Sequence, residues 1–403
     1  MPEELNEQDW SARRAMIASD NQRRMITHLK NRTSDVAEGA MENDARVYTD
    51  PKRFEREMDV LFRDTPLVAG LSGDLPVAGS IMLFEELDQS ILITRNKDGK
   101  VGAFLNMCTH RGAKLMEECA EKNRITCPFH GWSFDLDGQL AGLTAPETFA
   151  NMDRSTRALI KVPCIEWNGI IFIKARPGDD AIDIVAHLGS FAPELAQLEL
   201  QQSVPVKTGR LDADCNWKYA LDTYGEGYHF PVLHRETVSL LSAPNTFYDP
   251  FGNHHRIGWA LQSYKSLLDA PESEWPRAQF SAVHYLFPNT VIFYGAVTEG
   301  DVFVQIFRHF PDAVGKMHTN FSVYSPGEIT DESYRADVEA GFDGTAHVVD
   351  TEDYWIARNG WARLRDAPAG FKVLYSANEI ALQDNHKNIA AAIGMSLDVY
   401  ART

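Results

Sequence analysis

The sequence predicts an α+β fold in which a compact antiparallel β domain is inserted between a helical N-terminal segment and a larger mixed domain. Three observations predict it. Residues 1–63 carry helix signals, residues 64–177 alternate short β-rich runs with tight-turn dipeptides, and residues 178–403 combine strand-like apolar runs with a late helical segment. A chain of 403 residues is too long for one small core, so more than one domain is expected.

The N-terminal segment, residues 1–63, has one well-marked helix start. Asp50 precedes Pro51, a capping residue followed by proline at the first helical position. Apolar residues then recur at the helical spacing i, i+4, i+7 and i+8, at Phe54, Met58, Leu61 and Phe62. We therefore expect an amphipathic helix here, which ends before Pro66.

The segment from 64 to 177 contains repeated hairpin signals. Asp98-Gly99, Asp137-Gly138 and Asn168-Gly169 each lie beside short β-rich runs. Asp-Gly and Asn-Gly supply the positive φ angles of two-residue hairpin turns. Three such signals in about seventy residues favour an antiparallel β domain.

The segment from 178 onward follows a Pro-Gly-Asp-Asp linker sequence that starts at Pro177. Two apolar runs, TVIFYGAV from Thr290 and VFVQIFRHF from Val302, are typical of sheet strands. Residues 378–395 are predicted to be helical. The aromatic residues of this region are expected mainly in the core, with a substrate pocket as the alternative for Phe280, Tyr285, Phe287, Phe293 and Tyr294.

Composition and charge exclude several classes of protein. The formal net charge is −18, which disfavours nucleic acid and anionic membrane as partners. No run approaches the ~20 apolar residues of a membrane helix, and the acidic N-terminus does not resemble a secretory signal. Five cysteines are few and odd in number, so disulfides are not expected and a cytoplasmic location is predicted.

A metal-ligand pattern stands out in the β domain. Cys108 and His110 are followed after sixteen residues by Cys127 and His130, so that two matched motifs each supply one thiolate and one imidazole. This inventory suits a [2Fe–2S] cluster with two cysteines on one iron and two histidines on the other. The same residue types also bind structural zinc, which stays open as an alternative at this point.

The flanking residues carry a family resemblance. His110-Arg111-Gly112 and Pro128-Phe129-His130-Gly131-Trp132 resemble the fingerprint of Rieske non-heme iron oxygenases, α subunit. The resemblance implies that Cys108, His110, Cys127 and His130 hold a [2Fe–2S] cluster and that Arg111 and Trp132 surround it. A Rieske domain alone would be an electron carrier, and over 200 further residues need a different explanation.

A second constellation lies downstream. The stretch from Asn216-Trp217-Lys218 to His234 resembles the iron-binding segment of the catalytic domain of the same family, in which His229 and His234 match the iron ligands. Pro231 disfavours helical geometry at Phe230, so we expect the helix to break there and the two histidines to converge.

The third ligand implied by the resemblance is a carboxylate on a late helix. Such a residue would complete a 2-His-1-carboxylate triad for mononuclear Fe(II) with positions open for O2. The segment 379–385 fits this place, with Asp384 as the expected ligand and Glu379 as the weaker alternative.

Two more acidic residues are expected to have catalytic roles. Glu226 precedes His229 by three residues, at a position where the family holds an acid, usually Asp, that links a ligand histidine to a cluster histidine of the neighbouring subunit. Glutamate at this place is similar to the carnitine monooxygenase branch. Asp222, one helical turn earlier, is a second candidate, with a surface acid as the alternative.

The resemblance also implies the architecture and the reaction. We expect a Rieske domain inserted before a helix-grip (START-like) catalytic domain with a curved antiparallel sheet. The chain would hydroxylate a small, aromatic organic substrate with O2; the alternative is a quaternary ammonium compound of the carnitine or betaine type, and the alternative without enzymatic activity is an electron carrier. Aromatic side chains around the iron would favour an ammonium compound, and an Arg or Lys would favour a carboxylate.

The expected partners follow from what the sequence lacks. It contains neither a glycine-rich dinucleotide fingerprint after a strand nor a four-cysteine ferredoxin pattern, so electrons from NAD(P)H would come through a separate ferredoxin or reductase. By resemblance, the assembly would be a homotrimer, possibly with a small β subunit.

Overall fold

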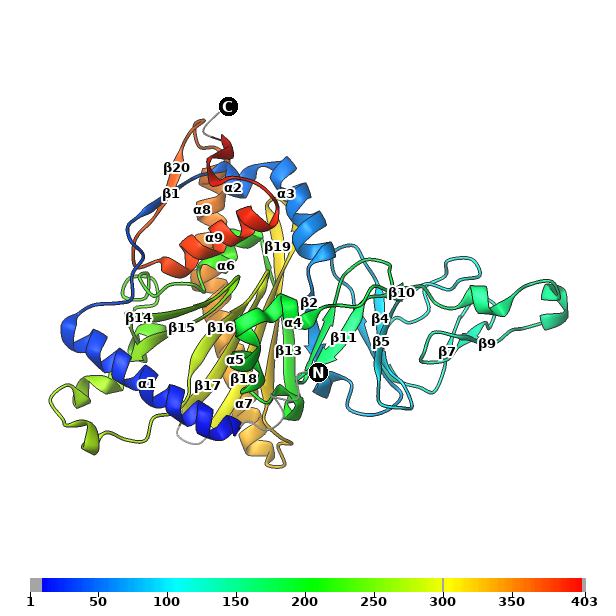
Figure 1. Cartoon of the computed structure of the whole chain (residues 1–403), viewed down its shortest axis with the longest axis horizontal. Coiled ribbons are helices and arrows are strands. Elements are labelled where there is room, and N and C mark those ends of the chain that lie inside the picture. Colours follow the sequence, from blue (N-terminus) through cyan, green and yellow to red (C-terminus); the bar gives the residue numbers. More distant parts are fainter. Residues whose placement is uncertain (1–8, 299–300, 401–403) are drawn as a thin grey trace. The chain divides into compact units, whose positions relative to one another are not determined.

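A computed structural model describes residues 9–298 and 301–400 of the chain (Figure 1). The chain divides into two compact units. The first comprises Met1–Leu61, Leu188–Glu199 and Val204–Thr403, and the second comprises Phe62–His187 and Leu200–Ser203. The second unit therefore extends beyond the expected 64–177: its main stretch runs from 62 to 187, and the chain returns to it at 200–203 before it enters the large sheet.

The second unit is built from eleven described strands in three antiparallel sheets. The sheet orders are β10-β5-β4-β3-β6, β11-β12-β2 and β7-β8-β9. The strands are β2 (Leu67–Leu71), β3 (Ser80–Phe84), β4 (Ile91–Arg95), β5 (Val101–Leu105), β6 (Ala120–Glu121), β7 (Ile125–Thr126), β8 (Ser133–Phe134), β9 (Leu140–Gly142), β10 (Lys161–Val162), β11 (Cys164–Trp167) and β12 (Ile170–Ile173).

The three expected turns are confirmed. Strands β4 and β5, β8 and β9, and β11 and β12 pair as antiparallel neighbours across them. Their glycines have positive φ, at 77° for Gly99, 80° for Gly138 and 83° for Gly169. Gly169 is also required by space, since an added Cβ would lie 2.0 Å from the backbone nitrogen of Gln201.

The first unit is organised around a seven-stranded antiparallel sheet of order β13-β19-β18-β17-β16-β15-β14. A small sheet pairs β1 with β20. The strands are β1 (Met41–Asp44), β13 (Val204–Ala213), β14 (Ser242–Phe251), β15 (His254–Leu261), β16 (Ala282–Leu286), β17 (Thr290–Thr298), β18 (Asp301–Ala313), β19 (Lys316–Ser325) and β20 (Lys372–Tyr375). The strands expected at 290–297 and 302–310 are thus confirmed as β17 and β18.

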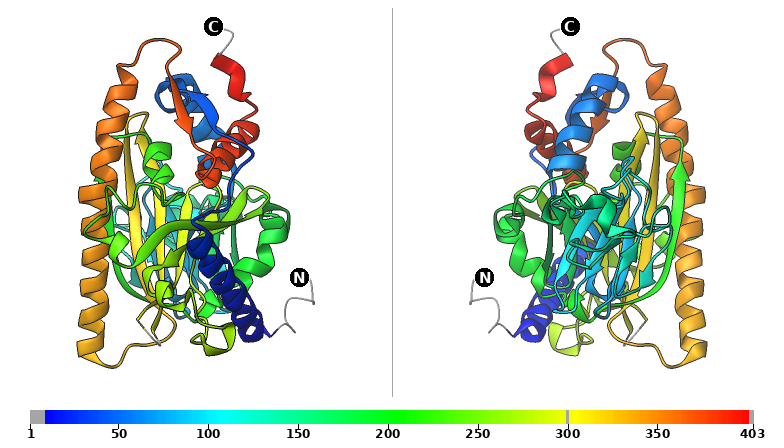
Figure 2. Two further views of the ribbon diagram at one scale, coloured as in Figure 1. Left: turned by 90° about the vertical axis from the view of Figure 1, so that its left-hand side faces the viewer. Right: turned by 90° about the vertical axis from the view of Figure 1, so that its right-hand side faces the viewer.

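Helices cover this sheet. They are α1 (Trp10–Asn31), α2 (Arg46–Thr49), α3 (Pro51–Glu57), α5 (Ala192–Ala196), α6 (Trp217–Asp222), α7 (Glu332–Val348), α8 (Tyr354–Arg365) and α9 (Ile380–Ala392); α4 (Ile184–Leu188) lies where the two units meet in the sequence. A π-helical turn, η11 (Val349–Asp353), joins α7 to α8 without a break. Figure 2 shows α7 and α8 running along one face of the sheet. This arrangement confirms the predicted α+β, helix-grip fold class.

Of the segment 1–63 that was expected to be helical, residues 1–8 lie outside the described residues. The rest is helical at 10–31, 46–49 and 51–64, with a loop at 32–40 and a strand at 41–44. Asp50 caps α3 by accepting a hydrogen bond from the backbone N–H of Lys52, with Pro51 at the first helical position. Strand β1 interrupts the helices. Its sequence is polar and carries no strand pattern, and its pairing partner, β20, lies more than 300 residues away in the chain, so the sequence did not predict it. The late helix expected at 378–395 is α9.

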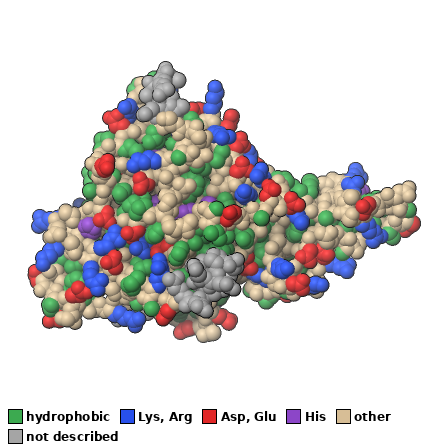
Figure 3. Space-filling view, viewed as in Figure 1, with side chains coloured by type: hydrophobic (Ala, Val, Ile, Leu, Met, Phe, Trp, Pro, Cys, Tyr) green, Lys and Arg blue, Asp and Glu red, His purple; other side chains and the backbone are tan. Residues whose placement is uncertain are grey.

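The surface carries charges of both signs over the face drawn in Figure 3. Within the described residues, no helix is both long enough and apolar enough to cross a membrane.

Candidate metal centres

Two loops of the β-rich unit present the four expected cluster residues in the same way. The backbone N–H of Cys108 donates to the carbonyl of Ala113, and that of Cys127 donates to the carbonyl of Trp132, in each case five residues on. The glycine four residues after each cysteine closes the turn, with φ of 77° at Gly112 and 71° at Gly131. The two loops therefore have the same backbone hydrogen bonds and the same glycine turn, and each carries one cysteine and one histidine.

The donor atoms of these loops fit a cluster with mixed ligands. Cys108 and Cys127 are free thiols, buried to 2% exposure each. The rings of His110 and His130 lie 4.8 Å apart, and the Nδ1 atom of each is buried without a hydrogen-bond partner. A buried ring nitrogen without a partner is costly unless something binds it. Two thiols and two such imidazole nitrogens form the donor set of a Rieske-type [2Fe–2S] centre.

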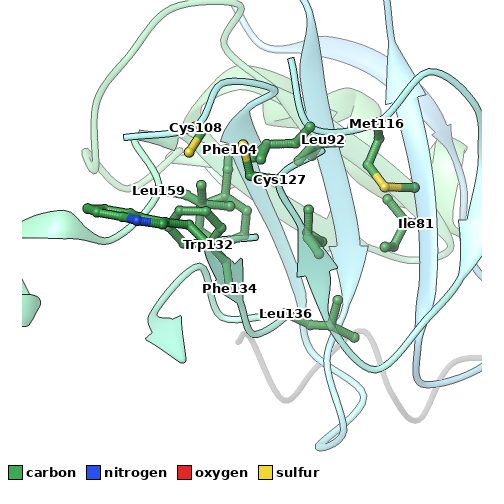
Figure 4. Close-up of a cluster of buried hydrophobic side chains, with 12 residues drawn as sticks. Ile81, Leu92, Phe104, Cys108, Met116, Cys127, Trp132, Phe134, Leu136 and Leu159 are labelled. Atoms are coloured by element: carbon green, nitrogen blue, oxygen red, sulfur yellow. The ribbon is translucent and has the colours of Figure 1, made fainter. Parts of the chain in front are cut away.

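Aromatic and apolar side chains pack around the two loops. Trp132 is buried and stacks on His110, with ring centroids 4.7 Å apart and planes 11° apart. Figure 4 shows Cys108, Cys127 and Trp132 at the edge of an apolar cluster that includes Phe134. Outside it, Phe129 is exposed beside His130.

The second site begins at α6, where the sequence prediction needs a correction. Asn216 caps this helix through the backbone N–H of Lys218. The helix ends at Asp222 rather than near Phe230, and Gly225 and Gly227 follow it. Both glycines are in crowded places, since an added Cβ would lie 2.7 Å from Leu382 at Gly225 and 2.6 Å from Trp259 at Gly227.

A separate single turn brings the two histidines together. The backbone N–H of Leu233 donates to the carbonyl of His229, and that of His234 donates to the carbonyl of Phe230. The two imidazole rings then lie 4.8 Å apart. Their convergence was expected, but it comes from this turn and not from a broken helix.

A carboxylate from η11 completes the group. Asp353 Oδ1 lies 3.3 Å from His234 Nε2 and 3.6 Å from His229 Nε2. The three residues are the set among the described residues whose ligand atoms lie within 4.8 Å of one another. His229 Nε2 is buried and has no hydrogen-bond partner. Two imidazoles and one carboxylate on one side form the facial triad of non-heme iron sites.

Two further carboxylates orient the histidines. The Nδ1 atom of His229 hydrogen-bonds Glu226, and that of His234 lies 2.6 Å from Glu352 Oε2. Both Nε2 atoms therefore face Asp353, as is common for metal-binding imidazoles. Burial alone would lower the pKa of His234, but Asp353 and Glu352 outweigh it and raise that pKa above its usual value.

The structure does not support the prediction that Asp384 is the third ligand, because this residue lies outside the group of His229, His234 and Asp353. Asp384 lies on α9, where its Oδ2 accepts a hydrogen bond from the Tyr248 hydroxyl at 2.8 Å. Its Oδ1 pairs with Lys387 at 3.2 Å on the surface. The structure groups Asp353 with the two histidines instead.

Glu379 and Asp222, the other two carboxylates considered from the sequence, also lie outside the group formed by His229, His234 and Asp353. Glu379 accepts hydrogen bonds from the backbone N–H and hydroxyl of Ser376, and burial together with Glu226 raises its pKa. Asp222 accepts a hydrogen bond from the Tyr48 hydroxyl at 2.5 Å and contacts His386 Nε2 at 3.2 Å. Asp222 therefore belongs to a buried polar cluster beneath α6.

Sequence reasoning missed Asp353 and Glu352. The spacing of buried residues along the helix could have indicated Asp353. Val338, Phe342 and Val349 lie four and seven residues apart on its buried side, and Asp353 follows four residues later on the same side. An acidic residue at a core position of an amphipathic helix is rarely left unpaired.

A cavity of about 380 Å³ opens beside the triad. Its uncharged polar members other than Tyr224 are Thr223, Thr237, Gln305 and Thr345, and valine, leucine and glycine residues supply much of the rest of the wall. Five aromatic residues line it: Tyr224, Phe230, Trp259, Phe293 and Phe307. Among the residues the structure describes, no lysine or arginine lines this cavity. Of the five late aromatics considered from the sequence, Phe293 alone belongs to the lining.

Two protein families match consecutive parts of the chain. Residues 65–162 match the Rieske [2Fe-2S] domain, and residues 200–395 match the ring hydroxylating alpha subunit (catalytic domain). The first match covers both cysteine–histidine loops, which decides between the iron–sulfur cluster and zinc. The second covers the histidines and Asp353.

Similar proteins agree with this division. The carnitine monooxygenase oxygenase subunit of Escherichia coli (strain K12) is 30% identical over 297 residues, 72% of this chain and 76% of that protein. The glycine betaine monooxygenase oxygenase subunit of Pseudomonas aeruginosa (strain UCBPP-PA14) is 28% identical, over 60% of this chain and 54% of that protein.

Solved structures share the fold. A quaternary ammonium Rieske monooxygenase in complex with L-carnitine superposes with a TM-score of 0.73 at 20% identity, over 89% of this chain and 96% of that one. A naphthalene 1,2-dioxygenase from Rhodococcus gives 0.66 at 18% identity, over 94% and 98%. This chain belongs to the Rieske non-heme iron oxygenases as an oxygenase α subunit, an oxidoreductase with a [2Fe–2S] cluster and a mononuclear iron.

Proposed function

We propose that this oxygenase acts on a quaternary ammonium compound. The observation that carries the proposal is the cavity beside the triad, which is lined by five aromatic side chains and, among the described residues, by no lysine or arginine. Aromatic faces attract cations, with about 0.5–2 kcal/mol per favourable contact, and this attraction grows when water is excluded.

The charges around the triad favour the same class of substrate. Three carboxylates, those of Glu226, Glu352 and Asp353, contact the two histidines. Against a divalent iron ion and neutral imidazoles, they leave a net negative charge. A cationic substrate beside them is therefore favoured electrostatically over a neutral aromatic compound.

The similar proteins support this substrate class. The two relatives are carnitine and glycine betaine monooxygenase oxygenase subunits, and carnitine and glycine betaine are quaternary ammonium compounds. The aromatic substrate that we expected from the sequence has less support, and the proposal replaces it with the ammonium alternative.

We assign the iron ligands as follows. Cys108, His110, Cys127 and His130 hold the [2Fe–2S] cluster, and His229, His234 and Asp353 hold the mononuclear iron. The cluster stores single electrons, and the mononuclear iron supplies an open site for O2. The chain's own part is to fix the imidazoles through Glu226 and Glu352 and to keep the substrate in an apolar cavity beside the triad.

Electron supply and assembly complete the proposal. Electrons from NAD(P)H would reach the cluster through a separate reductase, and a head-to-tail homotrimer would bring a cluster of one subunit to the iron of the next. Glu226 is the proposed link, because it is buried to 8% exposure and already holds His229. A carboxylate can accept hydrogen bonds from two imidazoles at once.

The test is oxygen consumption by the reconstituted enzyme. Purified protein with a reductase and NAD(P)H would be offered trimethylammonium compounds and, in parallel, naphthalene and benzoate. We expect O2 uptake coupled to an oxidised ammonium product that mass spectrometry identifies. Coupled oxidation of the aromatic compounds alone would overturn the proposal.

A further inference from the structure

Among the described residues that line the cavity, Gln305 is the one with an amide side chain. Gln305 lies on β18, directly opposite Phe293 of β17 and Val323 of β19 in the sheet register. Phe293 in turn pairs with Val283 of β16. Val283, Phe293 and Gln305 therefore form one row across three neighbouring strands, and all three line the cavity.

The amide of Gln305 makes no hydrogen bond that would hold it in the sheet, within the described residues. By contrast, Gln383 and Gln262 each donate two hydrogen bonds to backbone carbonyls. Gln305 is half-buried against the cavity. An amide carries two donors and an acceptor. The amide of Gln305 is open to the cavity, and a bound compound that covered it without a matching polar group would leave these donors and this acceptor unpaired, which is unfavourable. A ligand group would satisfy them.

The cavity has no lysine or arginine that would pair with a negative ligand group in the described part of the chain. Its acidic member, Asp353, lies with the two histidines of the triad. A carboxylate here would lose its hydration without an ionic partner, which is far costlier than burial of a hydroxyl beside an amide.

We propose that the substrate is an ammonium compound whose remaining part is uncharged and carries a hydroxyl or carbonyl group, which Gln305 binds. This inference rests on the proposed function and narrows it. It separates this chain from relatives whose names specify carnitine or glycine betaine, since both of those compounds carry a carboxylate. Gln305 is thus a specificity-determining residue.

The test uses three trimethylammonium compounds that differ in one arm: hydroxyethyl, ethyl or carboxymethyl. Each is assayed for kcat, KM and coupling of O2 uptake to product. We expect the hydroxyethyl compound to have the lowest KM and the carboxymethyl compound a KM at least about 100-fold higher, from the cost of burying an unpaired charge.

Two variants test the residue itself. In Gln305→Leu, the KM for the hydroxyethyl compound should rise about 2- to 12-fold, the loss of one neutral hydrogen bond. The KM for the ethyl compound should fall or stay the same, because its apolar arm no longer covers an unpaired amide. In Gln305→Arg, the carboxymethyl compound should become a substrate. Gln202→Leu makes the same chemical change at an exposed residue outside the cavity lining and should alter neither value.

The outcomes separate the two proposals. Equal KM values for the hydroxyethyl and carboxymethyl compounds in the natural protein would overturn the inference but leave the ammonium proposal standing. So would a Gln305→Leu variant that keeps its preference for the hydroxyl. If no ammonium compound is oxidised while aromatic compounds are, the proposed function itself fails. Iron content and the visible spectrum of each variant establish that it is folded and loaded.

Discussion

Replacement of Asp353 by asparagine should remove the mononuclear iron and leave the cluster intact. The substitution keeps the size of the side chain and removes its negative charge. Asp353 is buried to 7% exposure and its Oδ1 lies within 3.6 Å of both histidine Nε2 atoms. No other carboxylate joins this group in the described part of the chain.

The magnitude follows from the position of this carboxylate. Loss of a group that only orients a ligand typically costs 10- to 100-fold in metal affinity. Asp353 is placed as a ligand itself, so we expect at least about 100-fold, or about 2.7 kcal/mol. Asp384→Asn is the matched control. Its amide oxygen can still accept the hydrogen bond from Tyr248, so a change of stability below about 1 kcal/mol is expected.

The measurement is iron per chain by elemental analysis, together with the absorption spectrum of the cluster. The natural protein and Asp384→Asn should contain about three iron atoms, and Asp353→Asn about two, all with the same cluster spectrum. O2 uptake should be lost in Asp353→Asn alone. If Asp384→Asn loses the third iron while Asp353→Asn retains it, the assignment made from the geometry is refuted.

Other perturbations test separate parts of the site. Glu226→Gln should retain both metals, because an amide oxygen can still accept from His229, but should slow single-turnover oxygenation by about 10- to 100-fold; full turnover would refute the bridging role. Trp259→Leu should raise the KM of ammonium substrates by about 2- to 30-fold, with no change for the uncharged 3,3-dimethylbutyl analogue, which separates cation–π attraction from shape. Burial lowers the pKa of Lys218 to about 8, so the folded protein binds fewer protons than the unfolded chain between that pH and 10.5. Denaturant titrations should therefore show the stability of the natural protein rising, relative to Lys218→Met, by about 3 kcal/mol from pH 8 to pH 10.5, and a flat difference would contradict the burial of this charge. Removal of the mononuclear iron by a chelator should abolish O2 uptake, and Fe(II) should restore it to the natural protein but not to Asp353→Asn.

The sequence was informative wherever ligands lie close together in the chain. Cys108 and His110 share one loop, and His229 and His234 share one turn, so their spacing reports their geometry directly. The turn glycines of the β domain are local in the same sense.

The third ligand could not be found in this way. Asp353 lies more than a hundred residues beyond the histidines, and α7 and α9 both offer acidic residues at plausible places. Which helix faces the histidines is decided by packing on the seven-stranded sheet, which spacing does not encode. The same limit applies to β1, whose partner β20 is remote, and to Gln305, which joins the cavity through strand register.

The direction in which Asp353 points from its helix depends on the π-helical turn η11, at the end of which it lies. The turn lies between Phe342, which stacks on Phe321 of the sheet, and Ala357, which is buried in α8. A π turn holds one residue more than an α turn, and each residue of an α-helix advances the direction of its side chain by about 100°. Deletion of a single residue from α7 between 343 and 348 would therefore turn the carboxylate away from both imidazoles unless η11 closed to an α turn, which holds one residue fewer. The length of the helix between the sheet contact at Phe342 and Asp353 therefore sets the direction of this carboxylate, as the identity of Glu352 sets the orientation of His234.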